Sequence, residues 1–173
     1  MRRLVINLVL AIAAFIIQSC VFPQIPFLSA APNLMLILTF SFGFICGKDA
    51  GMLCGFLCGV LMDLFYSGPF GFHTLFYVWM GYANGIFTKY YYEDYIPLPL
   101  ILSLVNDLAY NLYIYIFLFL IRNRLHFLYY FREIILPEVI FTTLMTLVIY
   151  RVFLFITRKM EELEKRRDTD FVS

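Results

Sequence analysis

The sequence predicts an all-α integral membrane protein, built as a bundle of six transmembrane helices. Composition is the first indication: 62% of the residues are hydrophobic and 14% are charged, whereas soluble domains are about 45–50% apolar and about 25% charged. The second is that apolar stretches suited to a hydrocarbon core of about 30 Å recur along the chain. The third is a series of glycines at four-residue spacing, which lets membrane helices approach closely. The net charge of +1 indicates no nucleic-acid partner.

The first helix is expected at residues 4–22, directly after Arg2 and Arg3, and a proline-rich connection follows it. This helix could instead be a cleaved signal peptide. The apolar run is longer than the roughly 7–15 residues usual for such a signal. A retained helix is therefore the favoured interpretation.

The apolar segment 34–66 is too long for one membrane crossing, because a single helix of that length would measure about 50 Å. We therefore divide it at the Gly-Lys-Asp-Ala-Gly stretch into helices at 33–47 and 50–66. Gly47 and Gly51 flank the expected turn, where glycine tolerates backbone angles that other residues avoid.

The expected transmembrane domain covers residues 1–157. Its second half begins after a Ser-Gly-Pro-Phe-Gly turn, which is a strong signal for a break between helices. The last helix has a proline in its first turn, where proline is tolerated. A charged segment then closes the chain. The expected helices are 72–88, 98–121 and 134–157, and the charged tail is 158–173.

The distribution of basic residues predicts that both termini lie in the cytoplasm. Six helices place the termini on one side of the membrane, and the positive-inside rule selects that side. The tail supplies much of the excess, because the internal connections carry two basic residues and the external ones carry three. The inner set has nine members and the outer set three: Arg2, Arg3, Lys48, Lys89, Arg158, Lys159, Lys165, Arg166 and Arg167 inside, and Arg122, Arg124 and Arg132 outside.

The glycines form a stripe that leads to an aspartate. The stripe comprises Gly43, Gly47, Gly51, Gly55 and Gly59, and Asp63 follows four residues later. Small residues at this spacing predict a close helix crossing at Gly55 and Gly59. An acid on a membrane helix is energetically costly and needs partners. We expect Asp63 to bond to backbone or polar groups near the following turn and to hold helices 50–66 and 72–88 together.

A second polar cluster lies in the helix expected at 98–121. Ser103, Asp107, Tyr110 and Asn111 share one helix face, and Asp107 lies about 12 Å into the membrane. The cluster is interpreted either as a proton or substrate site or as a network that fixes helix packing. The structural interpretation is favoured, because no second acid is expected at the same depth. Arg151 lies at a comparable depth and is the expected partner of Asp107; the alternative is that Arg151 reaches the headgroups by itself.

The sequence predicts no catalytic, cofactor or metal site. Cys54 and Cys58 share a helix face, but neither a histidine nor a third ligand accompanies them at the usual spacing. Packing in helix grooves is the simpler explanation for these thiols. Asp63, Ser67 and His73 form the only grouping like a catalytic triad, and turn chemistry alone explains Ser67.

The order of these motifs resembles the central signature of the bacterial MreD family, and the resemblance covers nearly the whole chain. The shared features are a Pro-Asn pair, small-residue steps, an acid before a Ser-Gly-x-x-Gly turn, and a Gly-Tyr pair. An acid in the fifth helix and a Pro-Glu pair opening the sixth complete the pattern. The positions are Pro32, Asn33, Gly51, Gly55, Gly59, Asp63, Ser67, Gly68, Gly71, Gly81, Tyr82, Asp107, Pro137 and Glu138.

This resemblance implies a non-enzymatic role in cell-wall elongation, in the cytoplasmic (inner) membrane of a bacterium. The protein would bind an MreC-like single-span partner and help couple MreB filaments to peptidoglycan synthesis, beside the glycosyltransferase RodA and a class B transpeptidase. The aromatic residues Tyr129, Tyr130 and Phe131 could contribute to the partner interface, although an aromatic belt at the membrane surface also explains them.

Two other functions are considered. The resemblance implies a distant fold relation to the substrate-binding components of energy-coupling-factor transporters, so the runner-up is a vitamin-binding membrane component. Such a protein would carry an Ala-x-x-x-Ala motif in its first helix, and this chain has none there. An enzyme acting on lipid-linked substrates would need paired acids or a nucleophile near one interface. Asp63 and Asp107 are expected toward opposite faces, which argues against a shared catalytic site.

Overall fold

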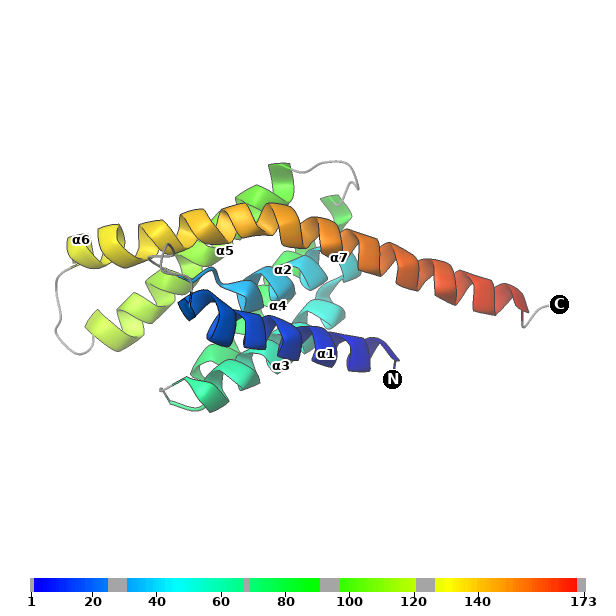
Figure 1. Cartoon of the computed structure of the whole chain (residues 1–173), viewed down its shortest axis with the longest axis horizontal. Helices are drawn as coiled ribbons and strands as arrows, with labels where there is room; N and C mark the ends of the chain where they lie inside the picture. The colour runs from blue at the N-terminus through cyan, green and yellow to red at the C-terminus, as the bar shows by residue number, and fades with distance from the viewer. Residues whose placement is uncertain (1, 25–30, 67–68, 91–96, 121–126, 171–173) are drawn as a thin grey trace.

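The computed structural model describes residues 2–24, 31–66, 69–90, 97–120 and 127–170, and within these ranges it contains helices and no strands. Figure 1 shows a bundle of elongated helices. Helices α1, α3 and α5 run toward one end of this bundle, and α2, α4 and α7 begin there. This end, on the left in Figure 1, is called the Asp63 end below.

The second helix lies at the centre of the bundle. Helix α2 spans Leu34–Cys46, and every residue from Leu34 to Phe44 is buried. A helix that is apolar on all sides belongs in a protein core or in a membrane. Within the described residues, five α-helices contact α2: α1 (Arg2–Ile16), α3 (Lys48–Phe65), α4 (Phe72–Ile86), α5 (Pro97–Ile114) and α7 (Leu136–Asp170).

The expected division of segment 34–66 is present, and a single residue makes the turn. Gly47 has φ 95° and ψ 179° and separates α2 from α3. This backbone conformation is essentially restricted to glycine. The expectation that Gly51 flanks the turn is wrong, because Gly51 lies inside α3 and is buried against other helices.

Two wide helical turns occur directly before prolines. The Phe22 N–H bonds to the carbonyl of Ile17 and the Leu136 N–H bonds to that of Phe131, five residues back in both cases. Proline cannot donate a hydrogen bond to the carbonyl four residues earlier, and its ring collides with it. A π-type turn before Pro23 and Pro137 lets each helix continue past this position.

The last helix is longer than expected at both ends. A short helix α6, Phe127–Tyr130, and a π turn, Phe131–Ile135, lead into α7 without a break. The segment before residue 134, which the sequence analysis treated as a connection, is therefore helical from Phe127. At the other end α7 continues through the charged tail to Asp170 and extends beyond the other helices in Figure 1.

Within the part of the chain that the structure describes, three helical stretches are long and apolar enough to cross a membrane by themselves: Asn7–Gln24, Leu98–Phe117 and Phe131–Ile156. Helix α2 is apolar but has 13 residues, or about 20 Å, which is less than the hydrocarbon core of about 30 Å. Because protein surrounds α2, its length need not match the bilayer. The crossing of the membrane by all six expected helices, and the fold relation to energy-coupling-factor components, stay predictions.

Candidate functional site

The carboxylate of Asp63 closes the turn between α3 and α4. Its Oδ2 accepts hydrogen bonds from the Gly71 N–H at 2.9 Å, the Thr74 N–H at 3.0 Å and the Thr74 hydroxyl at 2.5 Å, and its Oδ1 accepts one from the His73 N–H at 2.8 Å. Several of these donors belong to the first turn of α4, where backbone N–H groups lack partners within the helix. The expected contact between Asp63 and the following turn is therefore present.

The turn before α4 requires a glycine at its last position. Gly71 has φ 93° and ψ −9°, in the left-handed region, and immediately precedes α4. Its N–H donates to Asp63, so the turn geometry and the acid depend on each other. Gly68, the other glycine expected here, lies outside the described residues.

The glycine stripe forms the contact between α3 and α4, which is the most extensive helix contact in the described bundle. A Cβ atom added at Gly55 would overlap the backbone of Tyr77, and one added at Gly59 would overlap Thr74. A Cβ atom at Gly51 would overlap the backbone of Gly81. The spacing of four therefore brings the two backbones into direct contact, as small residues in membrane helices allow.

Asn33 connects three helices at the Asp63 end. Its side-chain oxygen accepts hydrogen bonds from the Leu36 N–H at 3.1 Å, which caps α2, and from the Tyr77 hydroxyl of α4 at 2.9 Å. Its own N–H donates to the Thr142 hydroxyl of α7 at 3.1 Å. An asparagine at a helix start satisfies N–H groups that have no partner within the helix. The Pro-Asn pair of the sequence therefore marks the point where α2, α4 and α7 meet.

Two tyrosines and a histidine extend this network across the core. The Tyr110 hydroxyl lies 3.2 Å from His73 Nδ1, and the rings of Tyr110 and Tyr77 are 5.7 Å apart. All three side chains are buried. Buried tyrosines need partners for their hydroxyl groups, and these contacts join the fifth helix to the fourth.

Residues Gln18 and Asn84 make contacts that the sequence analysis missed. The Gln18 side-chain oxygen accepts a hydrogen bond from the Met35 N–H at 3.1 Å, so the π turn Ile17–Val21 that follows α1 helps to cap α2. Asn84 and Asn106 exchange two hydrogen bonds, of 3.0 Å and 2.9 Å, between α4 and α5. Polar side chains in apolar segments are the signal that could have identified Gln18 and Asn84, but the signal does not indicate the partner.

Helices α5 and α7 face each other through a ladder of polar side chains, which we call the polar ladder. Its first step is the Ser103–Thr146 hydrogen bond, 2.7 Å long. Because the helices are antiparallel, moving four residues forward on α5 corresponds to moving four back on α7. The second step therefore brings Asp107 to Thr142, and the third brings Asn111 to Glu138. The sequence analysis identified the α5 side, but not the repeat of Thr142 and Thr146 on α7.

The expected ion pair between Asp107 and Arg151 is wrong. Asp107 is fully buried, whereas Arg151 is exposed. Arg151 lies five residues after Thr146, a rotation of roughly 140° around α7 from the face that meets α5. Equal depth therefore did not bring the two charges together.

Asp107 instead interacts with a second acid. Glu138 is partly buried, and both Asp107 and Asn111 of α5 act on its carboxyl group. The Thr142 hydroxyl lies near the Asp107 carboxylate but lacks hydrogen-bond geometry, so neither Asp107 oxygen has a hydrogen-bond partner. Pro137, the neighbour of Glu138, places the wide turn of the last helix immediately before this acid.

The arrangement around Asp63 does not resemble a catalytic triad. Its oxygens accept hydrogen bonds from N–H and hydroxyl groups, and the His73 ring meets Tyr110 instead. Ser67 lies outside the described residues. The sulfur atoms of Cys54 and Cys58 are 4.0 Å apart and buried. Within the described residues, no three His, Cys, Asp or Glu side chains gather in a way that could hold a metal ion.

Comparison with known families places this geometry in context. Residues 1–159 match the family described as rod shape-determining protein MreD. No curated protein and no solved structure is significantly similar to the chain. The matched region contains the Asp63 turn, the glycine stripe, Asn33 and the polar ladder. Since the match covers most of the chain and the helices are apolar, this integral membrane protein belongs to the MreD family of rod shape-determining proteins.

Proposed function

We propose that this rod-shape-determining membrane component has no enzymatic activity and acts by binding an MreC-like single-span protein. Through that partner it helps couple MreB filaments to peptidoglycan synthesis by RodA and a class B transpeptidase. The family match over residues 1–159 is the observation that carries this proposal. The proposed location is the bacterial inner membrane, with both termini in the cytoplasm, as the distribution of basic residues favours.

The hydrogen bonds inside the bundle support a structural role for Asp63 and Asn33, two residues of the motifs described above. Asp63 and Asn33 are buried and their side chains bond to groups of the protein itself. Catalysis needs a nucleophile and a base within reach of each other and of a substrate. In the described helices, the hydrogen bonds of these two residues join helices instead.

Helix α7 offers an extended surface for a single partner helix. Large apolar side chains recur on its exposed face at four-residue spacing, which aligns them in one stripe. We call them the α7 stripe: Leu136, Ile140, Leu144, Val148 and Val152. Such a stripe packs against lipid or against one apolar helix. The proposal assigns it to the partner, because α7 is the longest helix described and extends beyond the bundle.

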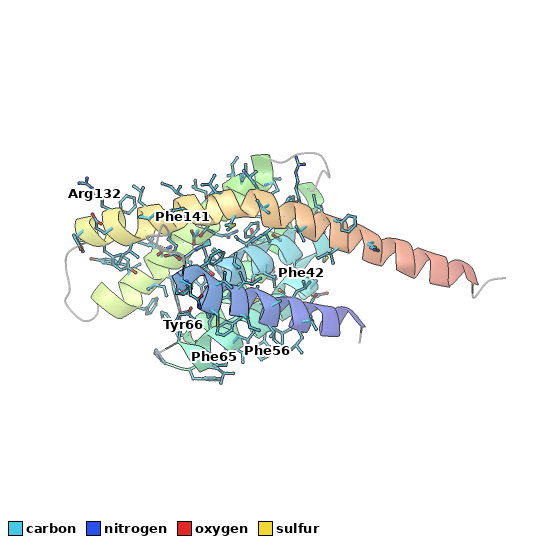
Figure 2. All side chains as sticks on the ribbon, in the orientation of Figure 1. Phe42, Phe56, Phe65, Tyr66, Arg132 and Phe141 are labelled. Atoms are coloured by element: carbon cyan, nitrogen blue, oxygen red, sulfur yellow. The ribbon has the colours of Figure 1, made fainter. Side chains whose placement is uncertain are left out.

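The aromatic residues Tyr129, Tyr130 and Phe131, which precede α7, differ in their surroundings. Tyr129 is 70% exposed and Phe131 is 39% exposed, whereas the Tyr130 ring lies 5.4 Å from that of Tyr115. Arg132 extends away from the bundle at the same end (Figure 2). Tyr129 is therefore available to a partner or to the membrane surface, and Tyr130 contributes to packing within the chain.

Site-specific photocrosslinking tests the proposal. A photoreactive residue at Val148, on the α7 stripe, should capture the single-span partner in cells, while one at the buried Thr146 should not. The control is Trp79, which is 61% exposed on α4. Crosslinks from Trp79 but not from Val148 would contradict the assigned surface. Capture of transporter ATPases in place of the single-span protein would favour a vitamin-transport role and contradict the proposed function.

A further inference from the structure

We propose that Asp107 and Glu138, with Asn111 and Thr142, bind a hard cation inside the bundle. The first observation is the position of the two acids. Asp107 is fully buried between α5 and α7, and it acts electrostatically on Glu138, which lies one turn away in the polar ladder. Among the described residues, the groups that act on these two carboxyls include no basic side chain. A buried carboxylate without a compensating charge is costly, and more so within a membrane.

The second observation is that Asp107 lacks hydrogen-bond partners. Both of its carboxylate oxygens are buried, and neither has a hydrogen bond in the described structure. By contrast, Asp63 accepts four hydrogen bonds at the turn before α4. Buried polar groups are nearly always satisfied, so two free oxygens on one carboxylate indicate a missing ligand.

The chemistry of the neighbouring side chains indicates the class of ligand. The four residues of the site offer carboxylate, amide and hydroxyl oxygens, and they offer neither sulfur nor imidazole. Oxygen donors of this kind select hard cations such as Ca²⁺, Mg²⁺ and Na⁺. Two carboxylates carry two negative charges when ionised, which a divalent ion neutralises completely.

A shared proton is the competing way to reduce this charge. One proton neutralises one carboxyl group and can connect only two oxygen atoms. A cation is coordinated by several oxygens at once, and so satisfies both Asp107 oxygens together with Glu138. Glu138 is only partly buried, so it is the side of the site that an ion reaches first.

The first test measures the melting temperature of the purified full-length protein in detergent. Ions are removed with a chelator, and chloride salts of Ca²⁺, Mg²⁺ or Na⁺ are compared with N-methyl-D-glucamine at constant ionic strength. A ligand that binds only the folded state raises the melting temperature in a saturable manner. We expect this rise with Ca²⁺ in the wild type and in Glu133→Gln, an exposed acid five residues before Glu138. We expect its loss in Asp107→Asn and in Glu138→Gln.

Terbium luminescence provides a test that does not depend on stability. Tb³⁺ replaces Ca²⁺ at oxygen sites, and Tyr110, on which both acids act electrostatically, would transfer excitation energy to it. The signal should be displaced by Ca²⁺, fall in Tyr110→Phe, and be absent in Glu138→Gln. The proposal would be overturned if none of the three cations changed the melting temperature of the wild type. It would also be overturned if Ca²⁺ raised the melting temperature of Glu138→Gln by the same amount as that of the wild type. If the melting temperature depended on pH in the same way in every salt, a proton would neutralise the charge of the two acids. This result would also overturn the proposal.

Discussion

Asp63 and Asp107 are both acids within apolar helices, and their surroundings differ in a way that separates their roles. Asp63 lies at a helix end, where free N–H groups of α4 surround it. Asp107 lies in the middle of α5, where the backbone N–H groups bond within the helix and only side chains can reach it. A helix end supplies donors for an acid without further residues. An acid in the middle of a helix depends on the neighbouring helices.

The first prediction concerns Asp63→Asn. The amide keeps one oxygen and turns its NH₂ toward N–H donors, so at least one hydrogen bond becomes a repulsive contact. We expect a loss of about 2 kcal/mol in stability, the usual cost of an unsatisfied buried group that had a charged partner. Thermal unfolding in detergent measures it, with Glu133→Gln as the exposed control. Equal melting temperatures for Asp63→Asn and the wild type would show that the carboxylate is not needed for the turn.

The second prediction concerns the reciprocal pair of Asn84 and Asn106. Each single change to alanine leaves the other amide without its partner, whereas the double change removes both. We expect the double variant to lose less stability than the sum of the single variants, with a coupling of about 1 kcal/mol, as for other polar pairs between membrane helices. A double-mutant cycle of melting curves measures this coupling. Strictly additive losses would mean that the two amides do not stabilise each other.

At the scale of the helices, α3 and α4 are held together by backbone contact. The glycines of α3 lie against Tyr77, Thr74 and Gly81 of α4, with no space for a side chain between them. Dispersion and weak polar contacts between backbones replace the hydrophobic effect, which does not act between helices in lipid. This contact also places Asp63 beside the start of α4, so the stripe and the acid support each other.

The third prediction concerns Gly55→Leu. The added side chain would overlap the Tyr77 backbone, and backbone cannot move aside as a flexible side chain does. We expect the variant to lose folded protein in detergent and to lose partner copurification. Ala13→Leu introduces the same side chain at an exposed position of α1 and should behave as the wild type. Size-exclusion chromatography compares the two, and a folded Gly55→Leu protein with an intact partner complex would contradict the prediction.

At the scale of the whole molecule, the bundle is organised around a helix that faces protein on all sides. α2 is the most completely buried helix described, and its start forms hydrogen bonds with Gln18 after α1, with Tyr77 of α4 and with Thr142 of α7. The lipid-facing surface is left to the other helices, which expose many large apolar side chains. This arrangement places apolar surface outside and a polar network inside, as a bilayer requires.

The fourth prediction concerns orientation. Cys46 is exposed beside the α2–α3 turn, and Tyr129 is exposed at the Asp63 end. If both termini are cytoplasmic, a membrane-impermeant thiol reagent added to intact spheroplasts should label a Tyr129→Cys protein in which the native cysteines are replaced. A protein retaining only Cys46 should be labelled only after the membrane is opened. The reverse pattern would invert the proposed topology.

The sequence by itself determined the membrane character, the helical class and the local breaks. Composition sets the first two, because lipid leaves backbone groups no partner outside the helix. Gly47 ends α2 because its backbone angles exclude other residues, and Asp63 finds its donors within eleven residues of chain. These features depend on local chemistry, which the order of residues contains.

Only the tertiary structure decided which distant side chains meet. Depth along each helix put Asp107 and Arg151 at one level, yet the rotation of α7 turns Thr142 and Glu138 toward Asp107 and Arg151 outward. Likewise, neither Asn84 nor Gln18 indicates its partner in the sequence. Helix adjacency and rotation result from the packing of all the helices around α2, and no single segment carries that information.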